Sequence, residues 1–155
     1  MSKIKVPDIE HSTYINVSPD RVYESVTTGK GWDGWFTQGT TVDPKPGGEI
    51  RLQWRNFGAG RWTMEDGGPV LEAKPNREFS FQWFPAGHST TVTLTLDSLG
   101  SGTFVKLVEK GYALNEEDLA ILVGCAVGWG EALTLLKFYL ERGLTYGEVP
   151  SGTNL

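Results

Sequence analysis

Residues 115–143, NEEDLAILVGCAVGWGEALTLLKFYLERG, form the stretch around which the rest of the chain is organised. One side of it repeats apolar residues at steps of three and four, the spacing of a stripe that a helix buries on one face. Asn115 is a suitable N-cap, and Gly143 can adopt the left-handed conformation that ends a helix. The sequence therefore predicts one long helix that other elements cover. The stripe consists of Leu119, Leu122, Ala126, Trp129, Leu133, Leu136 and Leu140.

The same stretch is long and apolar enough to suggest a membrane span. Glu131 lies within it, and an acidic residue well inside a spanning helix costs about 3 kcal/mol on insertion scales. The stripe also predicts burial on one face and not on all sides. We therefore expect a helix of a protein that does not enter a membrane.

Three glycines interrupt this predicted helix at positions 124, 128 and 130. Each lowers helix propensity by about 1 kcal/mol relative to alanine, so tertiary structure must offset them. We interpret them as sites where the helix backbone packs closely against a neighbouring element. The alternative is that they leave room for a ligand.

Length and charge restrict the classes of protein to consider. A chain of 155 residues suits one domain with a real core, and we expect that domain over 1–145 with a tail at 146–155. The net charge of −5 and the absence of a Lys/Arg cluster argue against a nucleic-acid partner. Cys125 is the single cysteine and cannot form an internal disulfide, and the first residues lack the apolar run of a secretory signal. We expect a cytoplasmic protein.

The first forty residues predict one strand and two short helices. Residues 9–17 alternate polar and apolar side chains, as a strand with one wet face does. Ser18 and Pro19 suit the cap and the first position of a short helix, which the glycines at 29 and 31 break. The segment 32–36 then repeats aromatic residues at helical spacing, which predicts a second short helix.

Period-two alternation returns after residue 40 and continues to residue 110. Gly-rich and Pro-rich turns separate the runs, and the run at 61–73 is expected to be interrupted by a bulge or tight bend at 66–69. Such strands form an antiparallel meander whose apolar face needs a cover, which the long helix supplies. The predicted fold class is α+β: a curved antiparallel sheet of about six to seven strands wrapped on a long C-terminal helix, with two short helices after the first strand.

Several motifs, taken in order, resemble a known family. They are SPDRVY at 18–23, GWDGWF at 31–36, PNREFSFQW at 75–83 and Gly128-Trp129 in the long helix. The chain resembles the START-like, birch-pollen-allergen-like helix-grip superfamily (SRPBCC), and within it the domains similar to the activator of the heat-shock-protein ATPase. The resemblance implies the helix-grip fold. It leaves the function open, because such domains include co-chaperone modules, lipid or hormone carriers and polyketide cyclase-like enzymes.

Aromatic residues at inward positions are the candidate walls of a ligand cavity between sheet and helix. Six tryptophans and seven phenylalanines are many for this length, and large rings often line cavities, although they also fill ordinary cores. Two histidines 77 positions apart and the single cysteine offer no metal-ligand spacing, and no cofactor motif or catalytic residue is predicted. The candidate ligand-binding residues are Trp32, Trp35, Phe36, Trp54, Trp62, Phe81, Trp83, Glu109 and Trp129.

Glu109 is the polar member of this set. It follows Val105 and Leu107 on the strand face assigned to the interior, where it could bind a polar group or act as a general acid or base. The alternative, which we favour, is a strand-end carboxylate in water or paired with an arginine. His11 is interpreted in the same way, as a hydrogen-bonded histidine at a sheet edge.

Three functions follow from these features. The leading hypothesis is a domain that binds a small, largely apolar molecule of unknown identity and is not expected to be an enzyme. The first alternative is a co-chaperone-like interaction module that stimulates a heat-shock-protein ATPase. The second is a polyketide cyclase-like enzyme that uses Glu109. A homodimer is compatible with the sequence and not indicated by it.

Overall fold

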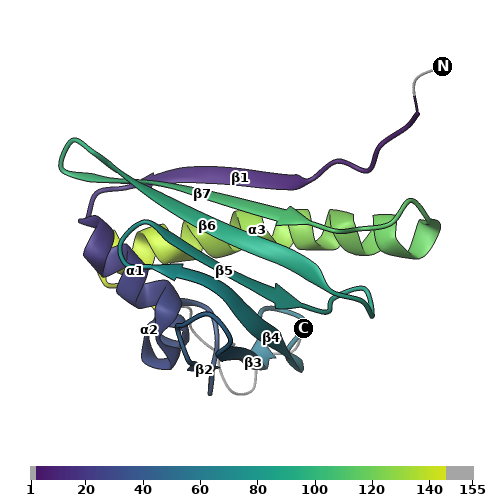
Figure 1. Cartoon of the computed structure of the whole chain (residues 1–155). Helices are drawn as coiled ribbons and strands as arrows, with labels where there is room; N and C mark the ends of the chain where they lie inside the picture. Colours follow the sequence, from purple (N-terminus) through teal and green to yellow (C-terminus); the bar gives the residue numbers. More distant parts are fainter. Residues whose placement is uncertain (1–2, 146–155) are drawn as a thin grey trace.

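The computed structural model describes residues 3–145, which form one antiparallel sheet, two short helices and one long helix (Figure 1). The strands follow the order β1-β7-β6-β5-β4-β3-β2, so the last strand in sequence pairs with the first. This architecture confirms the predicted α+β helix-grip class. The elements are β1 (Ile9–Ile15), α1 (Pro19–Thr27), α2 (Gly29–Trp35), β2 (Thr41–Val42), β3 (Glu49–Phe57), β4 (Trp62–Lys74), β5 (Glu78–Trp83), β6 (Thr90–Leu99), β7 (Gly102–Lys110) and α3 (Glu116–Arg142).

The α3 helix begins and ends where the sequence predicts. The side chain of Asn115 accepts a hydrogen bond from the Asp118 N–H over 2.8 Å, and Gly143 adopts a left-handed conformation with φ of 68°. These contacts satisfy backbone groups that a helix end leaves unpaired.

The two halves of α3 differ in burial. In the second half, the stripe residues Trp129, Leu133 and Leu136 are buried in the core, as predicted. In the first half, the stripe is only half-buried, and Val123 and Val127 are 61% and 69% exposed. The stripe therefore packs fully over part of its length only.

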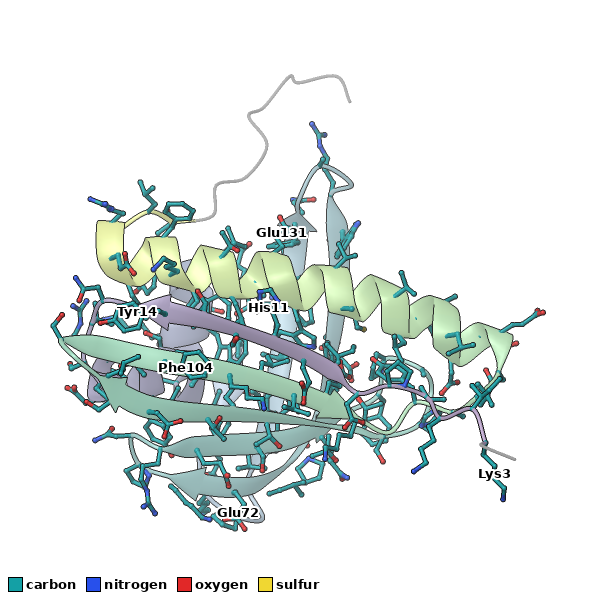
Figure 2. The ribbon with its side chains drawn as sticks, turned by 90° about the horizontal axis from the view of Figure 1, so that it is seen from above. Lys3, His11, Tyr14, Glu72, Phe104 and Glu131 are labelled. Atoms are coloured by element: carbon teal, nitrogen blue, oxygen red, sulfur yellow. The ribbon has the colours of Figure 1, made fainter. Side chains whose placement is uncertain are left out.

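By length and composition, α3 could also cross a membrane. Its second half, however, packs into the core of this domain, and Glu131 is exposed beside it (Figure 2). In this fold α3 is the helix that the sheet grips, and a cytoplasmic location stays a prediction.

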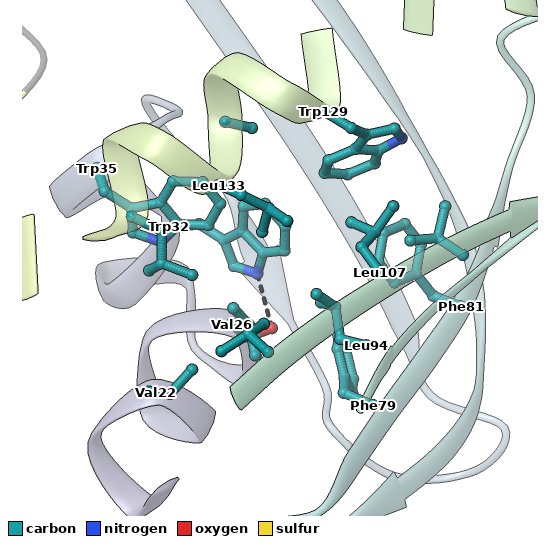
Figure 3. Close-up of a cluster of buried hydrophobic side chains, with 14 of the residues drawn as sticks. Val22, Val26, Trp32, Trp35, Phe79, Phe81, Leu94, Leu107, Trp129 and Leu133 are labelled. Atoms are coloured by element: carbon teal, nitrogen blue, oxygen red, sulfur yellow. Dashed lines mark hydrogen bonds between the residues drawn. The ribbon is translucent and has the colours of Figure 1, made fainter. Parts of the chain in front are cut away.

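A compact aromatic cluster joins α1 and α2 to the sheet (Figure 3). Trp32 and Trp35 stack with ring centroids 4.8 Å apart, and both are buried. The Trp32 indole N–H donates to the Val26 carbonyl over 2.8 Å, and that of Trp35 donates to the Ser25 carbonyl over 3.0 Å. Each indole therefore buries its ring and satisfies its polar group within the same cluster.

Two local predictions are wrong. The strand expected to break at 66–69 is continuous from Trp62 to Lys74, and its register shifts lie elsewhere, at Val70/Glu72 against β5 and at Trp54/Phe57 on β3. Gly31 does not break a helix but lies inside α2. A side chain there would come within 2.7 Å of the Glu24 carbonyl oxygen, which explains the glycine by close approach of two backbones. The domain limits 1–145 stay a prediction, and the tail at 146–155 lies outside the described residues.

Candidate ligand-binding cavity

A cavity of about 330 Å³ separates the first half of α3 from the sheet. Its walls come from the end of α2, from β3, β4 and β5, and from α3, so residues distant in sequence meet there. The lining residues are Phe36, Trp54, Trp62, Met64, Asp66, Trp83, Pro85, Ile121, Gly124, Cys125, Gly128 and Trp129. The volume lies in the range of small-molecule sites, and the walls are mostly aromatic or aliphatic, as in such sites.

Strand alternation explains the contribution of β4. Trp62, Met64 and Asp66 are two residues apart and therefore point to the same face of the sheet, toward the cavity. Glu65 points to the opposite face, where its carboxylate pairs with Arg51 over 3.2 Å. Trp62 is 56% exposed and lies at the mouth of the cavity.

The glycines of α3 separate into two kinds. Side chains at Gly124 and Gly128 would meet no atom within 4 Å, and both residues line the cavity. A side chain at Gly130 would lie 3.7 Å from the ring of His11 on β1 (Figure 2). Close packing, the interpretation favoured from the sequence, is therefore wrong for Gly124 and Gly128, which leave space instead, whereas a side chain at Gly130 would make an ordinary van der Waals contact.

Four aromatic rings form a closed circuit along the inner wall. Ring centroids are 5.5 Å apart for Phe36 and Trp54, 6.4 Å for Trp54 and Trp83, 5.4 Å for Trp83 and Trp129, and 6.4 Å for Trp129 and Phe36. These spacings are those of favourable edge-to-face and tilted aromatic pairs. The wall is therefore a set of rings that hold one another in place.

Glu109 lies behind this wall with no exposed surface. The indole N–H groups of Trp83 and Trp129 donate to its two oxygens over 2.7 and 2.9 Å. The hydroxyl groups of Thr90 and Tyr112 donate over 2.6 and 2.9 Å. Four neutral donors thus satisfy a carboxylate that can only accept. The environment favoured from the sequence, a strand-end carboxylate in water or paired with an arginine, is therefore wrong.

Two groups beside Glu109 hold their protons firmly. Burial, together with the neighbouring Cys125 thiol and the charge of Glu109, raises the pKa of Tyr112 far above its ordinary value. Burial also raises the pKa of Cys125 to about 11, and the charges of Glu109 and Asp66 add to that rise. Cys125 is therefore a neutral thiol at pH 7 and lacks the thiolate character of a reactive cysteine.

Asp66 places a second carboxylate in the wall of the cavity. It is half-buried, and its Oδ1 accepts hydrogen bonds from the backbone N–H groups of Gly67 and Phe84 over 2.7 and 3.0 Å. Its Oδ2 is 3.2 Å from the same Phe84 nitrogen. A carboxylate has about four acceptor positions, so Asp66 keeps capacity for a further donor.

An ion pair ties the loop between β5 and β6 to the start of α3. His88 Nε2 lies 2.7 Å from Asp118 Oδ2, which also accepts from the Ala113 N–H over 2.6 Å. The hydrogen bonds from Ala113 and His88 lower the pKa of Asp118, and the bond to Asp118 raises the pKa of His88. Because Pro85 of this loop lines the cavity, the pair helps to fix one side of its mouth.

The candidate residues from the sequence occupy two places. Phe36, Trp54, Trp62, Trp83 and Trp129 line the cavity. Trp32, Trp35, Phe81 and Glu109 lie in the core behind it, so a direct contact between any of them and a ligand stays a prediction.

Sequence reasoning missed several residues of the site. Asp66 shares strand parity with Trp62 and Met64, a signal that the Gly-Gly pair after it obscured. Tyr112 follows β7 after Gly111, where the chain turns with φ of 121° and no periodic pattern continues. No local pattern could have assigned it to Glu109.

Comparison with known proteins gives a family and a fold. The family described as "Activator of Hsp90 ATPase homolog 1-like protein" matches residues 16–141. No curated protein matches the chain.

Solved structures of the same fold are similar over most of this chain. The Aha1 dimer from Colwellia psychrerythraea, solved in solution, is 23% identical with a TM-score of 0.73, covering 89% of this chain and 98% of that one. A crystal structure of a protein from Mesorhizobium loti is 20% identical with a TM-score of 0.75, covering 88% and 98%. DynU16, from the dynemicin biosynthetic locus, is 20% identical with a TM-score of 0.72 over 88% of this chain, which spans only 48% of DynU16.

At these identities the structural likenesses show the fold alone, whereas the family match covers most of the chain, including α1, the whole sheet after β1 and nearly all of α3. The chain therefore belongs to the family of activator of Hsp90 ATPase homolog 1-like proteins.

Proposed function

We propose that this protein binds a small, largely apolar molecule between its sheet and the first half of α3. The observation that carries the proposal is the cavity of about 330 Å³ with a wall of four mutually packed rings. Gly124 and Gly128 support it, because both lower helix propensity and neither is required for packing. Two glycines that packing does not require, beside an open volume, therefore support a cavity rather than a filled core.

A fluorescent probe tests this proposal. N-phenyl-naphthylamine, a neutral and apolar dye, is expected to bind with saturation and to quench tryptophan fluorescence. Trp54→Ala should weaken binding by at least about tenfold, because it removes one ring of the wall. Phe104→Ala, on an exposed ring outside the cavity, is the matched control and should bind as the wild type does. Binding without saturation, or equal binding by both variants, contradicts the proposal.

Native mass spectrometry of the freshly purified protein adds a second readout. A bound molecule that persists from expression would appear as a discrete added mass, and the same spectrum reports the assembly state. The added mass should be lost in Trp54→Ala and kept in Phe104→Ala.

A second candidate function is a protein-interaction module. Val123 and Val127 form an exposed apolar pair one turn apart on α3, and the family is named after an ATPase activator. The proposed partner is an Hsp90-type ATPase or a second copy of the chain. Stimulation of such an ATPase, lost on charge reversal at Arg51 and Arg55 of the sheet, would support the first. A dimer in sedimentation that Val127→Glu converts to monomer would support the second.

The enzyme alternative has less support. Both oxygens of Glu109 already accept hydrogen bonds, and the residue has no exposed surface from which to reach a substrate. His11 is exposed and lies against Gly130, on the β1 side of α3. Turnover unchanged in Glu109→Gln would remove this alternative.

A further inference from the structure

Two carboxylates lie in and directly behind the wall of the cavity. Within residues 3–145, Asp66 supplies the one charged side chain among the lining residues, and Glu109 lies directly behind two of the rings. In the described part of the chain, the hydrogen-bond partners of Asp66 are backbone N–H groups and those of Glu109 are neutral side chains. In a partly desolvated site such charges act more strongly than they would in water.

The orientation of the indoles adds to this effect. Trp83 and Trp129 direct their N–H edges at Glu109, so their polar groups are occupied away from the cavity. What these two rings can offer a ligand is their carbon surface, whose faces carry negative potential. Hydrogen bonding to a carboxylate polarises an indole further in the same direction.

Aromatic faces beside a carboxylate are the chemistry that recognises organic cations. A quaternary or protonated amine is attracted to the face of tryptophan more than to any other ring, and the attraction grows when water is excluded. The cavity presents Trp54, Trp62 and the pair bound to Glu109, with Asp66 in the same wall. An anionic ligand would meet the negative charges of Asp66 and Glu109 there.

We propose that the ligand of this cavity carries one positive charge, as a quaternary or protonated amine on an apolar body. The inference rests on the proposed function and narrows it to a class of molecule. Asp66 and the ring faces bind the cationic head, and the space beside Gly124 and Gly128 takes the apolar body. Glu109 is a positioning residue, which orients two indoles and does not touch the ligand.

Three probes with the same phenethyl body test the charge. They are trimethyl(phenethyl)ammonium, its neutral isostere with a quaternary carbon in place of the nitrogen, and phenylpropionate. Binding is followed by the indole N–H signals in nuclear magnetic resonance at about 0.15 M salt, where attraction to surface charges beyond a Debye length is largely screened. We expect the cation to bind about tenfold more tightly than the isostere and the anion to bind most weakly.

Two variants with a matched control test which residues cause the preference for the cationic probe. Asp66→Asn keeps an oxygen to accept from the backbone and should reduce the preference for the cation to about twofold or less. Trp62→Leu, at the exposed mouth, should also reduce it and keeps an apolar side chain there. Glu65→Gln removes a charge from the neighbouring position on the outer face and should leave the preference unchanged.

The outcomes separate this inference from the proposed function. An isostere that binds as tightly as the cation overturns the inference and leaves apolar binding intact. A cation preference that persists in Asp66→Asn and Trp62→Leu overturns the assignment of the charge to this wall. Failure of all three probes to bind with saturation overturns both proposals.

Discussion

The six tryptophans divide by what lies against the ring into a core pair, Trp32 and Trp35, and four that line the cavity, Trp54, Trp62, Trp83 and Trp129. Trp32 and Trp35 donate to backbone carbonyls of α1 and are buried in the core. Trp83 and Trp129 donate to Glu109 and have the cavity beside them. Burial alone therefore does not identify a core tryptophan. A ring can be buried and still form one wall of an open volume.

Stability should separate the two groups most strongly. Trp32→Ala should lower the free energy of unfolding by about 4 kcal/mol, because it opens a void in packed core. Trp54→Ala should cost about half as much, since its ring already borders a cavity that the shortened side chain merely enlarges. Urea denaturation followed by circular dichroism measures both. Equal losses would contradict the division.

Substitution of Glu109 should have the next largest effect on the free energy of unfolding. Glu109→Gln should lower the free energy of unfolding by about 3 kcal/mol, because an amide offers one acceptor oxygen to four donors and turns its own N–H groups toward them. Tyr112→Phe, which removes one donor and keeps the ring, should cost about 1 kcal/mol. A neutral effect of Glu109→Gln in urea denaturation would count against the carboxylate as the centre of this network.

Substitution of a cavity-lining glycine of α3 should have a smaller effect on the free energy of unfolding, with the opposite sign. Gly128→Ala should raise the free energy of unfolding by up to about 1 kcal/mol and weaken binding of the naphthylamine probe, because it adds helix propensity and fills cavity space. Gly31→Ala, also in a helix, should destabilise the fold, since its side chain would come within 2.7 Å of backbone atoms of α1. If Gly128→Ala were destabilising as well, Gly128 would be a packing residue after all.

The ion pair between His88 and Asp118, beside the mouth of the cavity, should make the smallest contribution to stability. The pKa of Asp118 is lowered from 3.8, so its contribution to stability is present above that value and is lost as pH falls through the lowered pKa. The pKa of His88 is raised from 6.5, so its contribution is present below 6.5 and is lost as pH rises through the raised pKa. The pair should therefore stabilise most between about pH 4 and 6.5.

Nuclear magnetic resonance titration of the His88 ring checks this pair. The pKa of His88 should lie above 6.5 in the wild type and fall toward 6.5 in Asp118→Asn, which keeps an acceptor for the Ala113 N–H. An unchanged His88 pKa in the variant would show that the pair does not form in solution.

The sequence could predict the elements and much of the inward face, but not the space between the layers. Caps and periodicity located α3, and alternation placed Trp54 and Trp83 inward. Periodicity reports which face a side chain occupies, and it contains no information on the distance to the next layer. For that reason the sequence predicts a packing site at Gly128, although this residue borders the cavity.

The network around Glu109 depends on contacts that no local pattern encodes. Its partners come from β5, from the start of β6, from the turn after β7 and from α3. Only the sheet order and the register of β6 with β7, which sets Glu109 opposite Val92, bring them together. The face of Glu109 was predictable, whereas its four donors were not.

The most direct test of the cavity as a binding site is to follow all six indole N–H signals while the neutral isostere of trimethyl(phenethyl)ammonium is added. We expect saturable shifts for Trp54, Trp62, Trp83 and Trp129, with Trp32 and Trp35 unchanged. Uniform small shifts of all six signals, or shifts confined to Trp32 and Trp35, would contradict this expectation.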